Sequence, residues 1–162
     1  SRGMIELVLV RRAKSDWGDP ALADRDRPLN ARGTRDAPVM AGRFAEPGVG
    51  VQRLLSSTAV RARTTAEIFG AALGVEVGLD PELYLASAAT LLAKAAATST
   101  PSVMLVAHDP GLSDLAARLS DGGIEHLPTC AVARFSWKVA SWDEIASRVA
   151  DSWSLDTPRR SC

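Results

Sequence analysis

Arginine, serine and histidine side chains gather in three separate stretches of the sequence, each directly after a short apolar run. The first stretch holds Arg11, Arg12 and Lys14, the second Ser56, Ser57, Arg61 and Arg63, and the third His108 and Asp109. Guanidinium groups match the oxygens of an anion better than lysine does, because they offer paired N–H donors in one plane. If the fold brings the three stretches together, the chemistry that they predict is the binding of a phosphate-like anion.

The same residues have simpler interpretations when each is considered alone. Arginines in loops commonly pair with nearby carboxylates. The carboxylates available for this are Asp16, Asp19, Asp24 and Asp26. His108 alone would be typical of a buried structural histidine, and His126 belongs to the polar loop GGIEHLPT, where we expect no chemical role. The coincidence of three stretches favours a shared site over these interpretations.

Apolar runs alternate along the chain with segments of helical periodicity. The short continuous runs at 5–10, 52–56 and 102–107 are typical of strands covered on both faces. Helices are predicted at 31–45, 59–73, 87–97 and 111–119. Alternating patterns at 131–137 and 148–155 predict two further strands toward a sheet edge.

Three residues set the expected limits of these helices. Asn30 is a predicted N-cap, and Gly74 is a predicted C-cap. Pro38 has no N–H to donate and disrupts a helix interior, so the first helix is expected to kink or to start late.

The order of these elements predicts an α/β fold. Alternating strands and helices form a three-layer sandwich, with a mostly parallel central sheet and helices on both faces. In such sheets ligands bind outside the carboxyl ends of the strands, where the strand order reverses. All three polar stretches begin at such ends.

Length and composition predict one globular domain. The 162 residues are enough for a single core. We expect the domain to span 4–157, with 1–3 as a cloning remnant rather than a signal peptide and 158–162 as a frayed tail. The hydrophobic share of 46% is ordinary. No apolar run approaches the ~18 residues of a membrane span, so we expect no membrane partner.

Charge and cysteine content narrow the class further. The formal net charge is zero, which argues against nonspecific binding of nucleic acid. Cys130 and Cys162 show no metal-binding spacing, so we expect both to be free thiols in a reducing compartment. The expected location is the cytoplasm.

Six motifs, in this order, resemble one family. They are VRRAKSDW, DRPLNARG, SSTAVRARTTAE, PELYLAS, VAHDPGLSDLA and LPT, spread from Leu7 to about Phe135. Together they resemble SixA-type phosphohistidine phosphatases, small members of the histidine phosphatase superfamily that also contains the cofactor-dependent phosphoglycerate mutases. The resemblance implies the phosphoglycerate mutase-like fold and a phosphatase that needs neither cofactor nor metal.

The resemblance also implies a role for each matching residue. Arg11 corresponds to the phosphate-binding arginine after the first strand, and Arg61 to the phosphate-binding arginine that opens the helix after SSTAV. His108 corresponds to the second histidine of the family's site, and Thr129 falls near the pocket in relatives. A structural role in the loop and helix start is implied for Asn30, Arg32 and Gly33.

Arg12 departs from the family, because relatives carry a nucleophilic histidine at this position. A neutral imidazole attacks phosphorus through a free lone pair. A guanidinium has no free lone pair and stays protonated at neutral pH. Loss of a covalent nucleophile commonly lowers the rate by about 10⁴–10⁶. We therefore expect the family's reaction to be largely absent from this chain.

Two smaller departures concern charge and proton transfer. Asp109 stands where asparagine is common, and we expect it to offset the charge of Arg12. Leu85 stands where many relatives carry an acid, which leaves the proton donor open. The candidates for an acid or a supporting group are Asp24, Asp26 and Glu82. A phosphohistidine substrate needs less acid assistance, because a protonated imidazole is a good leaving group.

Three functions remain open from the sequence. The first is a SixA-type phosphatase in which Arg12 is an introduced or variant residue and histidine restores activity. The second is a natural pseudophosphatase that binds phosphate or a phosphohistidine-bearing protein without turnover. The third, ranked last, is a phosphatase of small esters with another nucleophile.

Overall fold

The structure, a computed structural model, describes residues 3–146 and 148–159 of the chain. The strands are β1 (Ile5–Arg11), β2 (Arg53–Ser56), β3 (Val77–Leu79), β4 (Ser102–Ala107), β5 (Val132–Trp137) and β6 (Ser152–Asp156). The helices are α1 (Ala31–Phe44), α2 (Val60–Leu73), α3 (Ala88–Ala97) and α4 (Gly111–Leu119). Three short 3-10 turns lie at Asp24–Asp26 (η1), Pro81–Leu83 (η2) and Trp142–Glu144 (η3).

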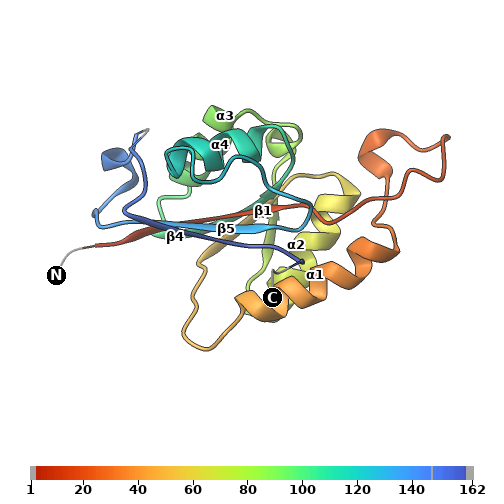
Figure 1. Cartoon of the computed structure of the whole chain (residues 1–162), viewed down its shortest axis with the longest axis horizontal. Helices are drawn as coiled ribbons and strands as arrows, with labels where there is room; N and C mark the ends of the chain where they lie inside the picture. Colours follow the sequence, from red (N-terminus) through yellow and green to blue (C-terminus); the bar gives the residue numbers. More distant parts are fainter. Residues whose placement is uncertain (1–2, 147, 160–162) are drawn as a thin grey trace.

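The six strands form one sheet in the order β3-β2-β4-β1-β5-β6. The strands β1, β2, β3 and β4 pair in parallel, whereas β5 and β6 pair antiparallel at one side. The predicted α/β fold with a mostly parallel sheet is confirmed. Figure 1 shows α3 and α4 on one face of this sheet and α1 and α2 on the other, which makes three layers.

Alternation along the central strands fills two cores. Leu7 and Leu9 of β1 pack under α3 and α4. Val8 and Val10, which point to the opposite face, pack against α1 and α2. Because successive side chains of a strand alternate between faces, a continuous apolar run is what a strand covered on both sides requires.

The helix limits follow the predicted caps. The Asn30 side chain accepts the Gly33 N–H at 2.9 Å, and Gly74 ends α2 in the left-handed conformation. The expected late start of α1 is wrong, because the helix begins at Ala31 and contains Pro38 in its interior. Pro38 lies on the exposed face of α1. Proline has no N–H, so one carbonyl in the preceding turn has no helical partner. On this exposed face, water can donate a hydrogen bond to that carbonyl.

Two elements at the sheet margins differ from the sequence prediction. The edge strand β3 was not predicted, and β6 begins at Ser152, four residues after the predicted start. Both are edge strands, exposed or half-buried along their length, so the apolar pattern that marks a buried strand is weak there. No helix of the described residues is long and apolar enough to cross a membrane.

Candidate active site

The strand order brings the three polar stretches to one edge of the sheet. Arg11 pairs with Ala107 in the register of β1 and β4, and the Arg12 N–H donates to the Ala107 carbonyl at 3.1 Å. His108 is the next residue after that carbonyl. The Ser57 N–H donates to the Val106 carbonyl at 3.2 Å, so the end of β2 lies beside the same place.

His108 is buried and neutral. Its side chain belongs to a residue that is 2% exposed, and its Nε2 lies 2.6 Å from the Ser57 hydroxyl. The ring meets the Tyr84 ring edge to face at 5.5 Å between centroids. Burial, with repulsion from Arg61 and Arg12, lowers the pKa of His108 to about 3. A neutral imidazole at physiological pH follows.

Arg12 is a partly buried cation in a crowd of other cations. Burial, followed by repulsion from Arg11, Arg61 and Arg27, lowers its pKa to about 10. Its Nη1 donates to the Ala13 carbonyl at 3.4 Å. A group with this pKa remains protonated at neutral pH, so Arg12 offers positive charge and N–H donors and no lone pair for attack on phosphorus.

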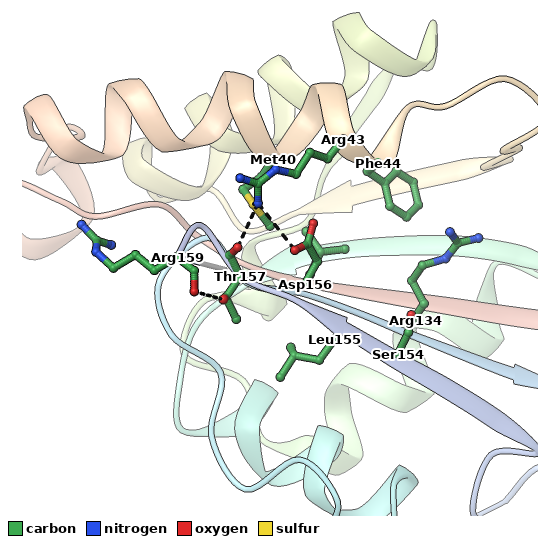
Figure 2. A pocket seen from close by; sticks show the side chains of 10 residues that line it. Met40, Arg43, Phe44, Arg134, Ser154, Leu155, Asp156, Thr157 and Arg159 are labelled. Atoms are coloured by element: carbon green, nitrogen blue, oxygen red, sulfur yellow. Dashed lines mark hydrogen bonds and ion pairs between the residues drawn. The ribbon is translucent and has the colours of Figure 1, made fainter. Parts of the chain in front are cut away.

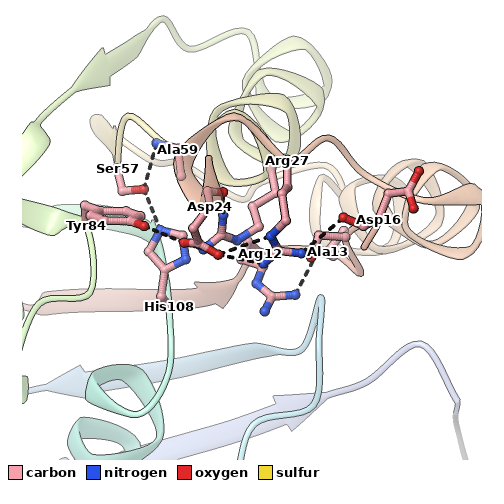
Figure 3. A network of polar contacts seen from close by, with 11 residues as sticks. Arg12, Ala13, Asp16, Asp24, Arg27, Ser57, Ala59, Tyr84 and His108 are labelled. Carbon is pink, nitrogen blue, oxygen red and sulfur yellow. Dashed lines mark hydrogen bonds and ion pairs between the residues drawn. The ribbon is translucent and has the colours of Figure 1, made fainter. Parts of the chain in front are cut away.

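Asp24 holds the guanidinium groups in place (Figure 3). Its carboxylate accepts from Arg61 Nη2 at 2.9 Å and from Arg27 Nε at 3.1 Å, and its backbone carbonyl accepts from Arg61 Nη1 at 2.7 Å. The Tyr84 hydroxyl also donates to this carboxylate. The bond from Tyr84, and then those from Arg61 and Arg27, hold the pKa of Asp24 far below its usual range. Asp24 is thus suited to support the arginines and unsuited to donate a proton.

Arg27 and Tyr84 are site residues that sequence reasoning missed. Arg27 is buried, donates to the Ser15 hydroxyl at 2.7 Å and stacks over Trp17 at 3.4 Å from the ring centroid. Tyr84 follows η2 and reaches Asp24. Both come from loops away from the strand ends. The signal for them in the sequence is that Arg27 belongs to the motif DRPLNARG and Tyr84 to the motif PELYLAS. The resemblance alone assigns neither residue a role.

As expected, the charge of Asp109 offsets part of the repulsion that lowers the pKa of Arg12, but Asp109 forms no ion pair with Arg12. Asp109 accepts from the Ser113 N–H at 3.0 Å and from the Ser113 hydroxyl at 2.7 Å. Its other neighbours are Arg11 Nη1 at 3.6 Å and His126 Nδ1 at 3.7 Å. Among the described residues no ion pair joins it to Arg12. The reason is local, because the first turn of α4 draws the carboxylate back toward Ser113.

The other candidates lie at varied distances from this centre. Glu82 forms an ion pair with Lys94, and its side chain is 67% exposed. It is therefore not placed to transfer a proton at His108. Asp26 is exposed. Thr129 is half-buried beside Cys130, whose N–H donates to the Arg11 carbonyl at 2.9 Å. Thr129 therefore lies next to the end of β1.

Cys130 is a buried free thiol, as expected. Burial raises the pKa of the Cys130 thiol to about 12, so this thiol is protonated and unreactive. Cys162 lies outside the described residues. No group of histidine, cysteine and carboxylate side chains with the arrangement of a metal site occurs within 3–146 and 148–159.

Several buried side-chain nitrogen atoms of the site have no hydrogen-bond partner among the described residues. They are the Nε atoms of Arg11, Arg12 and Arg61 and the Nδ1 atom of His108. A buried polar group without a hydrogen bond costs free energy, and such groups in a native protein are expected to have a use. Three guanidinium groups with spare N–H donors, beside one imidazole with an unpartnered nitrogen, suit an anion that carries several oxygens.

A cavity of about 570 Å³ lies in another part of the molecule, between the end of α1 and the strands β5 and β6 (Figure 2). Arg43 crosses it, donating to the Thr157 carbonyl at 3.0 Å and pairing with Asp156 at 3.5 Å. Arg134 pairs with Glu6 at 3.3 Å. Arg43 and Arg134 are thus already matched by carboxylates, and Arg159, which also lines the cavity, is exposed. Size alone therefore does not make this cavity the site, and the unpartnered donors beside His108 do.

Comparison with known proteins defines the class. The family model of the histidine phosphatase superfamily, branch 1, matches residues 7–84, which include Arg11, Arg12 and Arg61. An uncharacterized chloroplastic protein of Arabidopsis thaliana is 30% identical, over 93% of this chain and 75% of that protein. The chain belongs to the histidine phosphatase superfamily.

Solved structures narrow the class to the SixA type. The structure designated phosphohistidine phosphatase SixA from Agrobacterium tumefaciens is 30% identical, with a TM-score of 0.75, over 85% of this chain and 94% of that one. The SixA structure from Nakamurella multipartitia is 26% identical, with a TM-score of 0.80, over 96% and 97% of the two chains. The predicted membership of the SixA type is confirmed, and so is the phosphoglycerate mutase-like fold.

Proposed function

We propose that this chain is a SixA-type phosphatase domain that binds the phosphoryl group of a phosphohistidine on a protein, and that Arg12 leaves it with little turnover. The observation that carries the proposal is the set of buried, unpartnered nitrogen atoms on Arg11, Arg12, Arg61 and His108. A phosphoryl group would accept these bonds and would offset the repulsion among the cations.

The chemistry follows from what each group can do. Arg11, Arg61 and His108 hold the equatorial oxygens of the phosphoryl group. In the family's reaction an imidazole at position 12 attacks phosphorus in line, the N–P bond of the substrate breaks, and water then hydrolyses the new N–P bond. Arg12 keeps the binding part of this design and removes the attack.

A protein-borne phosphohistidine is the substrate class that needs least from the missing acid. Asp24 is ionised, and the place of the family's acid is taken by Leu85. An alkoxide leaving group would need a proton from such an acid. An imidazole leaving group departs without one once its ring is protonated, so the lack of an acid selects against esters.

A second candidate function is a natural pseudophosphatase that binds phosphate or a phosphorylated partner without turnover. The lowered pKa of Arg12 favours it, since a cation strained by burial and by Arg11, Arg61 and Arg27 gains most from a bound dianion. In this case Arg12 is a specific anion ligand rather than the mere absence of a nucleophile.

The substitution Arg12→His separates the two functions. We expect it to raise hydrolysis of a phosphohistidine protein by at least about 10³-fold, because it restores the covalent nucleophile. The matched control is Arg63→His, which adds a histidine on the exposed face of α2 and should leave the rate unchanged. Release of inorganic phosphate is measured on the phosphoprotein and on a generic aryl phosphate.

Two results would reject the phosphatase proposal. If both Arg12 and the His variant are inert while binding a phosphohistidine peptide equally, the chain is a binding protein. If the unchanged chain already turns over as fast as Arg12→His, the nucleophile lies elsewhere and the assigned mechanism is wrong.

A further inference from the structure

The contact between Ser57 and His108 is a buried polar pair that the mechanism above does not use. The Ser57 hydroxyl lies 2.6 Å from His108 Nε2, and neither residue is more than 2% exposed. Ser57 follows β2 and His108 follows β4, so the contact joins two strand ends across the sheet edge. Figure 3 shows Ser57 and Arg12 on opposite sides of the His108 ring.

The direction of this hydrogen bond follows from the other partner of Ser57. The Ala59 N–H donates to the Ser57 hydroxyl oxygen at 3.3 Å. The hydroxyl proton then needs an acceptor, and within the described residues the close one is His108 Nε2. The reverse direction would leave a buried hydroxyl proton unpaired, which costs free energy.

A proton on Ser57 that points at Nε2 decides where the imidazole carries its own proton. A neutral imidazole has one N–H and one unprotonated nitrogen. With Nε2 accepting, the N–H is at Nδ1, and Nδ1 is the buried atom without a partner among the described residues. The unpartnered atom is therefore a donor, which is what an anion requires.

We propose that Ser57 is a positioning residue that holds His108 as the Nδ1–H tautomer, so that Nδ1–H donates to an oxygen of the bound phosphoryl group. The inference rests on the proposed function and deepens it. In the other tautomer Nδ1 would present a lone pair to the anion, and the two would repel. Ser57 thus selects attraction over repulsion without touching the ligand.

Ser57 has a competing interpretation as the replacement nucleophile, with His108 as its base. A nucleophile must reach phosphorus, but the His108 ring lies between Ser57 and Arg12, the position of the family's nucleophile. Its oxygen also accepts the Ala59 N–H, which holds it toward the backbone of α2's first turn. The positioning role needs no movement of any of these groups.

Heteronuclear NMR of the imidazole nitrogens tests the tautomer directly, and the chain has only two histidines to assign. The unchanged protein should show His108 protonated at Nδ1. Ser57→Ala should shift the population toward the Nε2–H tautomer, and Ser57→Thr, which keeps the hydroxyl, should restore the Nδ1–H form. Ser56→Ala is the matched control, because the Ser56 hydroxyl donates to the Ser57 carbonyl and leaves His108 alone.

Sulfate binding at pH 7, measured by calorimetry on the same variants, gives the second readout. Ser57→Ala should weaken it about 10-fold or more, the effect of losing a hydrogen bond to a charged group, with Ser57→Thr and Ser56→Ala close to the unchanged protein. An Nε2–H tautomer in the unchanged protein, or no change of tautomer in Ser57→Ala, overturns the proposal. If the tautomers behave as expected but no variant binds sulfate, the anion-binding function fails and the control of His108 by Ser57 stands. Turnover of an aryl phosphate that is abolished in both Ser57→Ala and Ser57→Thr would instead identify a nucleophile.

Discussion

Asp24 is the carboxylate on which the buried arginines of the site depend. The side chain of Asp24 is 44% exposed, whereas those of Arg61 and Arg27 are 3% and 5% exposed. The two guanidinium groups are therefore largely removed from water. The Asp24 carboxylate that balances their charge is itself still partly hydrated. Removing one partner of such a pair leaves the buried charge unpaired, which costs more than the pair itself contributes.

We expect Asp24→Ala to lower the free energy of unfolding by about 2–3 kcal/mol, less than for a fully buried pair because Asp24 is partly in water. The matched control is Asp26→Ala, two residues away and exposed, which should change stability by less than about 0.5 kcal/mol. Urea denaturation followed by circular dichroism measures both. Equal losses in the two variants would contradict the assigned role of Asp24.

The sequence predicts well those site residues that lie at the ends of the parallel strands. Arg11 ends β1, Arg12 and His108 directly follow parallel strands, and the carboxyl ends of such strands meet at one edge. Arg27 and Tyr84 reach the site from loops whose path no periodicity describes. The hydrogen-bond partner of Asp109 is not predicted, because the short-range bonds to Ser113 compete with the longer-range attraction to Arg12.

The start of α4 is fitted closely against the loop before α3. A Cβ on Gly111 would lie 1.9 Å from the Ala86 carbonyl oxygen and 3.3 Å from a methyl of Leu91. The first of these atoms belongs to the backbone and cannot turn aside. Because Gly111 follows the stretch from His108 to Pro110, the same close approach sets where the imidazole stands relative to Tyr84, two residues before Ala86.

We expect Gly111→Ala to destabilise the fold by about 3 kcal/mol or more, since overpacking against backbone forces the two segments apart. The control Gly42→Ala is in an exposed part of α1 with nothing within 4 Å of the new Cβ. It should stabilise the protein by about 0.5–1 kcal/mol, because alanine is the better helix former. Thermal unfolding of the two variants decides, and a neutral Gly111→Ala would refute the close approach.

Among the helices and strands, those that the sequence predicts correctly are the ones to which burial gives a regular apolar pattern. The four helices and the central strands have strong periodicity because each has a face, or two faces, in a core. The strand β3, with Gly78 in its middle and three residues in all, lacks that pattern. Pro38 leads to the opposite error, the prediction of a late helix start. The hydrogen bond that it removes lies on the exposed face of α1, and Met40, Ala41 and Phe44 hold this helix to the core.

For the whole molecule, the buried neutral His108 makes stability depend on pH. The groups that face it are Arg61, Arg12 and Arg11, which disfavour its protonation, and Asp24, which favours it. Its pKa is about 3 in the folded protein, against an ordinary value of 6.5. Between these values the unfolded chain binds a proton that the folded protein does not, so the free energy of unfolding rises with pH. The stabilisation is complete above 6.5 and is lost as the pH falls toward 3.

We expect the free energy of unfolding to fall by about 2 kcal/mol between pH 7 and pH 5, since each pH unit below the unfolded pKa costs about 1.4 kcal/mol. This window lies above the titration of ordinary carboxylates, so His108 dominates it. His108→Gln, which cannot be protonated, should be less stable at pH 7 and nearly independent of pH in this range. His126→Gln removes the exposed histidine and should keep the full slope. Urea denaturation in buffers free of phosphate and sulfate measures all three, and a slope that vanishes in His126→Gln instead of His108→Gln would show that burial does not lower the pKa of His108.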